Sequence, residues 1–302
     1  MKKKIIVTAF SNLTTDQRIE KVCKTLHDNG YVIELIGCNY GCNQEVKREY
    51  TVEKINLISK SLKTAYFEFN WKLYQKLLNK SFENTVLLTN DLDTLLPNFL
   101  LSKKKKIPLV FDSHEIFTEM PAIQGKISQK IWRFAENKML PHIEFMMTES
   151  ESYAKWFHEK YNVTPVVVRN IPKKLPLQEK TLTQNPKIIL YQGAINPSRG
   201  IDKAILAMKF IENANVIIVG DGHIRKKNEA FAVSNHLAHK VQFLGKKRPS
   251  ELRTITQKAN VGISLEENNG VSYYYSLPNK VADYIQARVP LVMINFPEMI
   301  KI

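Results

Sequence analysis

The stretch "IILYQGAINPSRGIDKAILAMKF", residues 188–210, contains the unit from which the fold is predicted. A short run of β-branched and aromatic residues ends at Gly193, and a polar turn leads into a segment with helical periodicity. Strand, turn and helix in this order are typical of parallel α/β sheets, whose strands are buried on both faces.

The same unit recurs along the whole chain. In the first half, strands are predicted at 4–10, 31–37, 85–90, 107–112, 144–149 and 165–169, with helices near 16–29, 67–80, 92–103, 126–140 and 150–160. In the second half, strands are predicted at 188–193, 216–220, 241–245, 261–265 and 291–295, with helices near 199–210, 222–238, 249–258 and 278–288. This alternation predicts doubly wound parallel sheets.

The alternation stops once, at "IPKKLPLQEKTLTQNP", residues 171–186, which has three prolines and no apolar face. This composition indicates a linker. We therefore expect a domain at 1–170, a linker at 171–186 and a domain at 187–302. Ligands of such sheets bind beyond the carboxyl ends of the strands, so a cleft between the two domains is expected to hold the site.

Composition limits the classes of function. The chain has 44 Lys+Arg against 29 Asp+Glu and a net charge of +15, which favours nucleic acid, an anionic membrane surface or phosphorylated substrates as partners. Three cysteines, an odd number, argue against a disulfide scaffold and for a reducing compartment. No run of 18 apolar residues occurs. The sequence predicts a cytoplasmic protein, with contact to the inner membrane face as an open alternative.

Two cations stand at predicted helix starts, where the helix dipole disfavours positive charge. Lys280 lies in the first turn after "SLPN", residues 276–279, and Arg199 opens the helix after Gly193. Taken singly, Lys280 could form a solvated i,i+3 pair with Asp283, and Arg199 could be a surface arginine. Two such cations in one half indicate a bound phosphate group.

Other turns carry weaker signals. Gly220-Asp221-Gly222 either lets a helix start approach a ligand or makes a tight turn. His114, in "FDSHEIFTE" (residues 111–119), is either structural or a contact for a sugar hydroxyl or a leaving phosphate. Asp91-x-Asp93 is either a metal-binding pair or, more simply, a helix N-cap.

In order along the chain, these motifs resemble glycosyltransferase family 4, whose GT-B fold has two Rossmann-like domains. The matching segments are "TTDQRIEKVCKTLHDNGYVIELIG", "TNDLDTLLP", "FDSHEIFTE", "TESESYAKWF", "VVVRNIP", "YQGAINPSRGID", "VIIVGDGHIR", "FLGKKRPSEL" and "SLPNKVADYIQARVPLVMINFPEM". The resemblance implies transfer of a sugar from a nucleotide-diphosphate donor to an acceptor, with retention of configuration and without a metal or other cofactor.

The resemblance also implies roles for residues. Arg199 and Lys280 would bind the diphosphate, Asp283 the ribose (where the family usually has Glu), and His114 would lie near the transferred sugar. Glu266 and Glu267 are candidates for the acidic sugar contact. The remaining donor-side candidates are Gly193, Gly220, Asp221, Gly222 and Asn279, and the acceptor-side candidates are Asn12, Thr14, Arg18, Asp91 and Glu115.

The sequence departs from the family at three places, one of which is the acidic sugar contact: its position stays open between Glu266 and Glu267, because "NNGVSYYY" intervenes before the Pro-Asn-Lys stretch. The first turn, "AFSNLTTDQ", has no glycine pair, and the chain stops at "NFPEMIKI", where family members continue with a strand and helices. We therefore expect a short carboxy-terminal domain and weakened donor binding.

Several functions remain open on this evidence. A sugar-nucleotide epimerase and a non-catalytic nucleotide-sugar binder are the alternatives to a transferase of cell-surface polysaccharide synthesis. Expected partners are a nucleotide sugar, a carbohydrate or lipid-linked acceptor, and an anionic membrane surface. Nucleic acid is not expected, because binding would need basic residues interleaved with aromatic ones along a face, and "YYYSLPNK", residues 273–280, is the only suggestive patch.

Overall fold

The computed structural model describes residues 2–14, 16–42, 44–174, 176 and 185–302. The chain divides into two compact units, which we call unit 1 (Met1–Thr118 and Gly125–Arg169) and unit 2 (Glu119–Gln124 and Asn170–Ile302). Most of the predicted linker, namely residue 175 and residues 177–184, lies outside the described residues.

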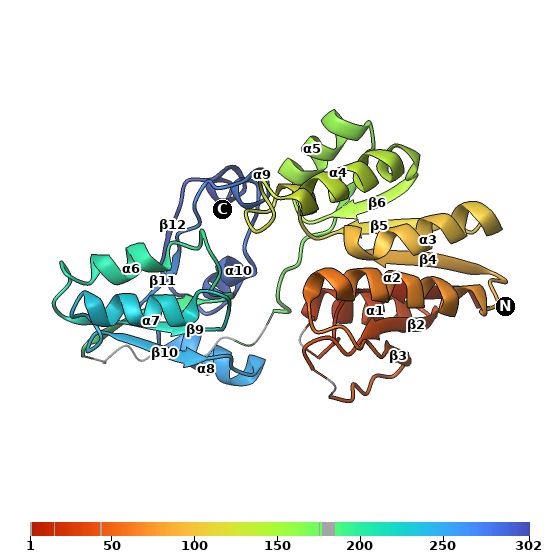
Figure 1. The fold of residues 1–302 in the computed structure, drawn as a ribbon. Coiled ribbons are helices and arrows are strands. Elements are labelled where there is room, and N and C mark those ends of the chain that lie inside the picture. Colours follow the sequence, from red (N-terminus) through yellow and green to blue (C-terminus); the bar gives the residue numbers. More distant parts are fainter. Residues whose placement is uncertain (1, 15, 43, 175, 177–184) are drawn as a thin grey trace. The chain divides into compact units, whose positions relative to one another are not determined.

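Unit 1 is built on a parallel seven-stranded sheet in the order β3-β2-β1-β4-β5-β6-β7 (Figure 1). Its strands are β1 (Lys4–Thr8), β2 (Val32–Cys38), β3 (Thr51–Ile55), β4 (Thr85–Asn90), β5 (Leu109–Ser113), β6 (Phe145–Thr148) and β7 (Val166–Val167). Its helices are α1 (Gln17–Asp28), α2 (Leu62–Leu78), α3 (Leu92–Lys105), α4 (Ile127–Met139) and α5 (Glu151–Tyr161), with short 3₁₀ turns η1 (Phe117–Glu119) and η2 (Leu140–His142).

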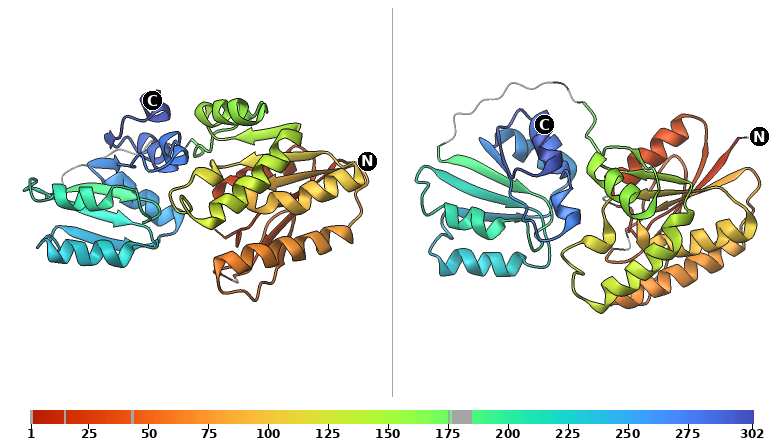
Figure 2. Two further views of the ribbon diagram at one scale, coloured as in Figure 1. Left: turned by 45° about the horizontal axis from the view of Figure 1, so that its top comes forward. Right: turned by 90° about the horizontal axis from the view of Figure 1, so that it is seen from above.

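Both faces of the unit 1 sheet are covered. Ile5 and Val7 of β1 pack with Ile19 and Cys23 of α1 on one face. Helices α2, α3 and α4 lie side by side on the other face (Figure 2). Burial on both faces explains why these strands are nearly continuous apolar runs.

Unit 2 is built on a parallel five-stranded sheet in the order β10-β9-β8-β11-β12. Its strands are β8 (Lys187–Gln192), β9 (Ala214–Val219), β10 (Val241–Gly245), β11 (Val261–Ser264) and β12 (Leu291–Met293). Its helices are α6 (Ile201–Ala207), α7 (Arg225–Ser234), α8 (Pro249–Lys258), α9 (Val271–Tyr274), α10 (Asn279–Gln286) and α11 (Pro297–Ile300).

Alternate residues of β8 enter two different cores. Ile189 and Tyr191 pack toward α6 and α7, whereas Ile188 and Leu190 pack toward α8 and α10. The strand is therefore covered on both sides, and the prediction of two doubly wound parallel sheets is confirmed.

The strand orders locate a switch point in each unit. From β8 the chain winds outward through β9 and β10 and then returns to place β11 on the other side of β8. In unit 1 the corresponding reversal lies between β1 and β4. At such a point the loops after neighbouring strands diverge, which leaves room for a ligand at the carboxyl edge.

Several elements were not predicted. The most notable is β3, whose sequence TVEKI carries two charges. It is an edge strand that pairs only with β2 among the described residues, so its side chains can remain in water, and Glu53 pairs with Lys80 at 3.1 Å. The predicted strand 165–169 pairs only at Val166–Val167, and the short helices α9 and α11 fall where no periodicity could be recognised.

Two further observations concern the chain as a whole. All three cysteines are free thiols. Over the described residues, no helix combines the length and the apolar character needed to cross a bilayer.

Candidate functional site

Three charged side chains meet at the switch point of unit 2. Lys280 Nζ lies 2.6 Å from Glu266 Oε1, and Arg199 Nη1 lies 3.4 Å from the same oxygen. Glu266 follows β11, Arg199 lies in the loop after β8, and Lys280 is in the first turn of α10. The two cations singled out in the sequence therefore share one location, which we call the switch-point cluster (Arg199, Glu266 and Lys280).

Glu266 and Lys280 of the switch-point cluster are buried, Arg199 is partly exposed, and the cluster carries a net positive charge. The exposed fractions of Glu266 and Lys280 are 1% and 7%. Burial lowers the pKa of Lys280 to about 8, against the opposing effect of Glu266. Burial alone would raise the pKa of Glu266, but Lys280, Ser264 and Arg199 together hold it below its ordinary value. With Lys280 protonated the three charges sum to one positive, which attracts an anion strongly at a site with little water.

The solvated Lys280–Asp283 pair is wrong, because Lys280 is buried against Glu266. Asp283 instead accepts a hydrogen bond from Gln192 Nε2 at 2.9 Å. Gln192 is fixed in turn by Thr256, whose hydroxyl donates to Gln192 Oε1 at 2.7 Å. Asp283 is thus oriented at the carboxyl end of β8, four residues after Asn279, where α10 begins.

Three residues that were not predicted from the sequence, Tyr191, Tyr273 and Ser264, support the cluster. The Tyr191 ring lies 4.3 Å from Lys280 Nζ, and the Tyr273 ring lies 4.1 Å from Arg199 Cζ, so each cation rests on an aromatic face. Ser264 donates a hydrogen bond of 2.7 Å to Glu266 Oε2. Ser264 ends β11, and Tyr191 is the penultimate residue of β8; this placement at strand ends was the available signal.

Glycines of unit 2 allow loops to pack closely around this edge. A Cβ on Gly220 would lie 1.8 Å from the Gly193 carbonyl oxygen, and one on Gly222 would lie 2.4 Å from that of Ile195. Helix α7 begins only at Arg225, so Gly222 is not at a helix start. The tight turn expected at Gly220-Asp221-Gly222 is present, and Asp221 accepts a hydrogen bond from the Gly222 N–H at 2.8 Å; contact of this turn with a ligand stays a prediction.

The second acidic candidate, Glu267, lies apart from the cluster. Its Oε1 is 2.7 Å from Lys203 Nζ, and the side chain is 24% exposed. It therefore forms an ordinary surface ion pair, unlike its neighbour Glu266.

In unit 1, His114 lies between two carboxylates. Its Nδ1 is 3.2 Å from Asp91 Oδ2, its Nε2 is 3.4 Å from Asp112 Oδ2, and its backbone N–H donates to Asp91 Oδ1 at 2.8 Å. Burial opposes the charge on the ring, but Asp91 and Asp112 outweigh it and raise the pKa of His114 well above 6.5. Among the described residues, Nε2 makes no hydrogen bond of normal geometry, although it is buried.

The contacts of Asp91 correct one prediction. Asp91 occupies the N-cap position of α3, but its side chain makes no capping hydrogen bond because the carboxylate is turned toward His114. Asp93 is buried, and its pKa is raised well above the ordinary value, mainly by burial and to a lesser extent by repulsion from Asp91 and Glu115. A carboxyl held neutral in this way is a poor metal ligand.

The other acceptor-side candidates have different surroundings. Arg18 is buried and donates to Asp112 from both Nε (3.1 Å) and Nη2 (2.5 Å). Asn12 accepts hydrogen bonds from the N–H and the hydroxyl of Thr14 (3.1 and 2.6 Å), so these two residues shape the loop after β1. Glu115 is partly buried beside His114. Arg18 and His114 thus share Asp112 as a partner, whereas Asn12 and Thr14 do not take part in these contacts.

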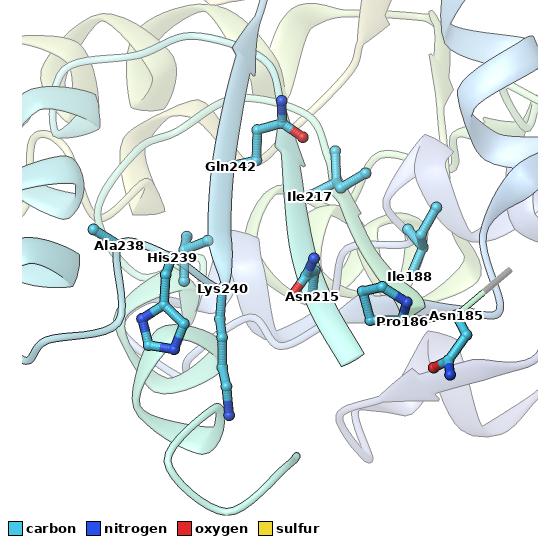
Figure 3. Close-up of a pocket in the computed structure, with 10 residues that line it drawn as sticks. Asn185, Pro186, Ile188, Asn215, Ile217, Ala238, His239, Lys240 and Gln242 are labelled. Atoms are coloured by element: carbon cyan, nitrogen blue, oxygen red, sulfur yellow. The ribbon is translucent and has the colours of Figure 1, made fainter. Parts of the chain in front are cut away.

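Two further features of the described residues lie away from these clusters. A hollow of about 770 Å³ opens at the amino-terminal ends of β8 and β9, lined by residues that include Asn185, Asn215, His239 and Lys240 (Figure 3). It is at the opposite edge of the sheet from the switch-point cluster. One group with metal-ligand spacing occurs in the described part, His27, Asp28 and Glu49. Lys24 Nζ already pairs with both carboxylates there, at 3.1 and 3.2 Å.

Comparisons with known proteins agree with this architecture. Residues 174–301 match the model of the family "glycosyl transferases group 1". A curated relative, an uncharacterized glycosyltransferase of Methanocaldococcus jannaschii, is 38% identical over 71 residues, which cover 24% of this chain and 20% of the relative.

Solved structures match over the whole chain. A sucrose-phosphate synthase from Thermosynechococcus elongatus has a TM-score of 0.78 at 14% identity, covering 97% of this chain and 81% of that one. HepE of Anabaena in complex with UDP-glucose has a TM-score of 0.71 at 13% identity, covering 99% of this chain and 82% of that one. The chain therefore has the GT-B fold of glycosyltransferases, and its residues 174–301 match the group 1 glycosyl transferases.

Proposed function

We propose that this protein transfers a sugar from a nucleotide-diphosphate donor to an acceptor, with retention of configuration and without a metal ion. The observation that carries the proposal is the switch-point cluster, which holds a net positive charge in a buried position at the carboxyl edge of the unit 2 sheet. Retention is inferred from the likeness of the motif order to glycosyltransferase family 4.

In the proposed reaction the bond between the anomeric carbon and the diphosphate oxygen breaks, and its electron pair stays on the diphosphate. The acceptor oxygen then bonds to the same face of the anomeric carbon and gives its proton to the departing diphosphate. Arg199 and Lys280 stabilise the charge that builds up on the phosphates, as do the N–H groups at the start of α10. Both cations are held in place beforehand by Glu266, so they need little reorganisation during the reaction.

Other groups take supporting roles in this proposal. Asp283, oriented by Gln192, binds the ribose hydroxyls. Nε2 of His114, a buried nitrogen that lacks a normal hydrogen bond in the described part of the chain, donates to a hydroxyl of the transferred sugar. The glycine-lined loops at 193 and 220–222 shape the wall near the phosphates.

Solved structures of the same fold suggest which nucleotide sugars to examine first as donors. Solved neighbours of the same fold are complexes with UDP or UDP-glucose in HepE of Anabaena, and with UDP in TarM of S. aureus. We therefore propose UDP sugars as the first donors to examine, with a carbohydrate or a lipid-linked acceptor.

The test is thermal unfolding of the full chain across a panel of nucleotide sugars, followed by a transfer assay with and without EDTA. A bound donor at 100 times its Kd stabilises the protein by about 2.7 kcal/mol. We expect stabilisation by nucleoside diphosphates and its loss in Lys280→Met. The matched control is Lys203→Met, which changes an exposed lysine of the same unit. The proposal is overturned if no nucleotide diphosphate stabilises the chain, or if both variants respond alike.

Product analysis separates the enzyme alternatives. A transferase joins the sugar to the acceptor, whereas an epimerase releases an altered nucleotide sugar without any acceptor. A non-catalytic binder is stabilised by the donor and leaves it unchanged. Unaltered transfer in EDTA is expected, because the two cations supply the positive charge.

A further inference from the structure

We propose that the outer face of helices α2, α3 and α4 in unit 1 docks onto a lipid bilayer that contains anionic lipids. The three helices lie side by side on one face of the seven-stranded sheet (Figure 2). Tyr66 of α2 and Trp132 of α4 meet edge to face with ring centroids 5.6 Å apart, which ties the outer two helices together. Their outward sides therefore form one continuous surface, which we call the outer helical face.

Large apolar side chains project from all three helices. They are Phe67 and Trp71 on α2, Leu96 and Leu100 on α3, and Ile127, Ile131 and Phe134 on α4. Each set repeats at intervals of three or four residues, which places its members on one side of their helix. Phe67 and Ile127 are 79% and 78% exposed. Contiguous exposed apolar groups of this size are characteristic of interaction surfaces.

The exposed charges on the same helices are of one sign. Exposed basic residues are Lys63, Lys103, Lys104, Lys105, Lys130, Arg133 and Lys138. Across residues 62–78, 92–105 and 127–139, all of which the structure describes, the acidic residues are Glu68, Asp93 and Glu136. Asp93 and Glu136 are buried, and Glu68 pairs with Lys72 at 2.6 Å. The outer helical face therefore presents apolar groups among positive charges, with no exposed carboxylate on its helices.

This combination selects the kind of partner. Nucleic acid is bound by basic grooves with aromatic rings on which bases stack, whereas four of the seven apolar groups here are aliphatic Leu or Ile side chains, which offer no ring for stacking. Aliphatic groups, aromatic rings and lysines in one layer are the composition of surfaces that lie in a bilayer interface, where lysine and arginine are attracted to anionic headgroups. The outer helical face belongs to unit 1, so the proposal is independent of donor binding in unit 2.

The test is sedimentation of the full chain with phosphatidylcholine vesicles that contain or lack phosphatidylglycerol. We expect binding to the anionic vesicles that weakens as salt is raised, because the attraction is screened. The double variants Ile131→Ser/Phe134→Ser and Lys130→Glu/Lys138→Glu are each expected to lower the affinity for anionic vesicles at least about tenfold. The first removes apolar area that the bilayer would bury, and the second reverses the charge of two lysines that would face anionic headgroups.

Matched controls come from exposed residues of unit 2. Phe210→Ser removes an exposed phenylalanine, and Lys226→Glu/Lys227→Glu makes the same charge change; both are expected to bind like the unaltered chain. Circular dichroism verifies that each variant is folded. A second readout is tryptophan fluorescence: the emission should shift to the blue with anionic vesicles, and this shift should be lost in Trp71→Phe, which keeps Trp132 and Trp156.

Three outcomes would overturn the proposal. The first is equal binding to neutral and anionic vesicles, or equal loss in the unit 2 controls. The second is binding of RNA, with no vesicle binding, through the same lysines. The third is a dimer of this chain that Ile131→Ser/Phe134→Ser dissociates, again with no vesicle binding.

Discussion

Replacing Glu266 by glutamine removes the carboxylate on which both cations of the switch-point cluster converge. At 2.6 Å from Lys280 Nζ, and with an effective dielectric constant of about 20, the attraction between the two charges is about 6 kcal/mol. Burial of the ions offsets much of that attraction. Removing one partner of a buried pair nevertheless costs about 3–5 kcal/mol, because the other charge stays buried without compensation.

The assay is thermal unfolding, monitored by calorimetry or by circular dichroism. For a domain of this size about 1 kcal/mol corresponds to roughly 2–4 °C, so Glu266→Gln should lower the Tm of unit 2 by roughly 6–20 °C. Glu267→Gln is the matched control, because the neighbouring carboxylate forms a partly exposed pair with Lys203 at 2.7 Å. Such pairs contribute about 0–1 kcal/mol, so the control should change the Tm by no more than a few degrees.

Pyrophosphate extends the test to the anion site. An anion bound between Arg199 and Lys280 replaces the missing charge, so pyrophosphate should raise the Tm of Glu266→Gln more than that of the unaltered chain. Equal unfolding temperatures of Glu266→Gln and Glu267→Gln would contradict the role assigned to the Glu266 carboxylate. Coupling below about 0.5 kcal/mol in a double-mutant cycle between Glu266→Gln and Lys280→Met would contradict it as well.

Three further predictions concern Lys280 of this cluster, His114 of unit 1 and the backbone at Gly220. The pKa of Lys280 is about 8, so the affinity for pyrophosphate, measured by calorimetric titration, should decline above about pH 8. In the unfolded chain the pKa of this lysine is near 10.5, so between about pH 8 and 10.5 the unfolded chain binds more protons than the folded one. The contribution of Lys280 therefore makes the stability rise with pH in this interval. The raised pKa of His114 adds stability below about pH 6.5 that is lost as pH rises through the folded value, and NMR titration should show a lower pKa in Asp91→Asn. Gly220→Ala should destabilise unit 2 by more than about 2 kcal/mol in urea unfolding, because its Cβ would overlap a carbonyl oxygen, whereas Gly41→Ala, also at positive φ but in open space, should cost about 1 kcal/mol.

The architecture of this protein could be predicted from local sequence patterns. Apolar runs such as "IILYQ", residues 188–192, are short, rich in β-branched residues and followed by a turn, and these properties depend only on neighbouring residues. Arg199 and Lys280 could be singled out for the same reason, since a cation at a helix start is unfavourable wherever the helix lies. Edge strand β3 was not predicted, because its two charged residues interrupt the apolar pattern.

Which side chains meet at a site could not be predicted from local patterns, because it depends on how the strands pair. Glu266 lies beside Arg199 and Lys280 because β11 pairs with β8, with Val261 opposite Ile189, although these strands are far apart in the sequence. In the same way, Asp91 approaches His114 and Asp112 because β4, which ends just before Asp91, is the neighbour of β5 in the sheet. Local patterns determine where strands and helices form, but strand pairing determines which strand ends are adjacent, and the charge at each site depends on that adjacency.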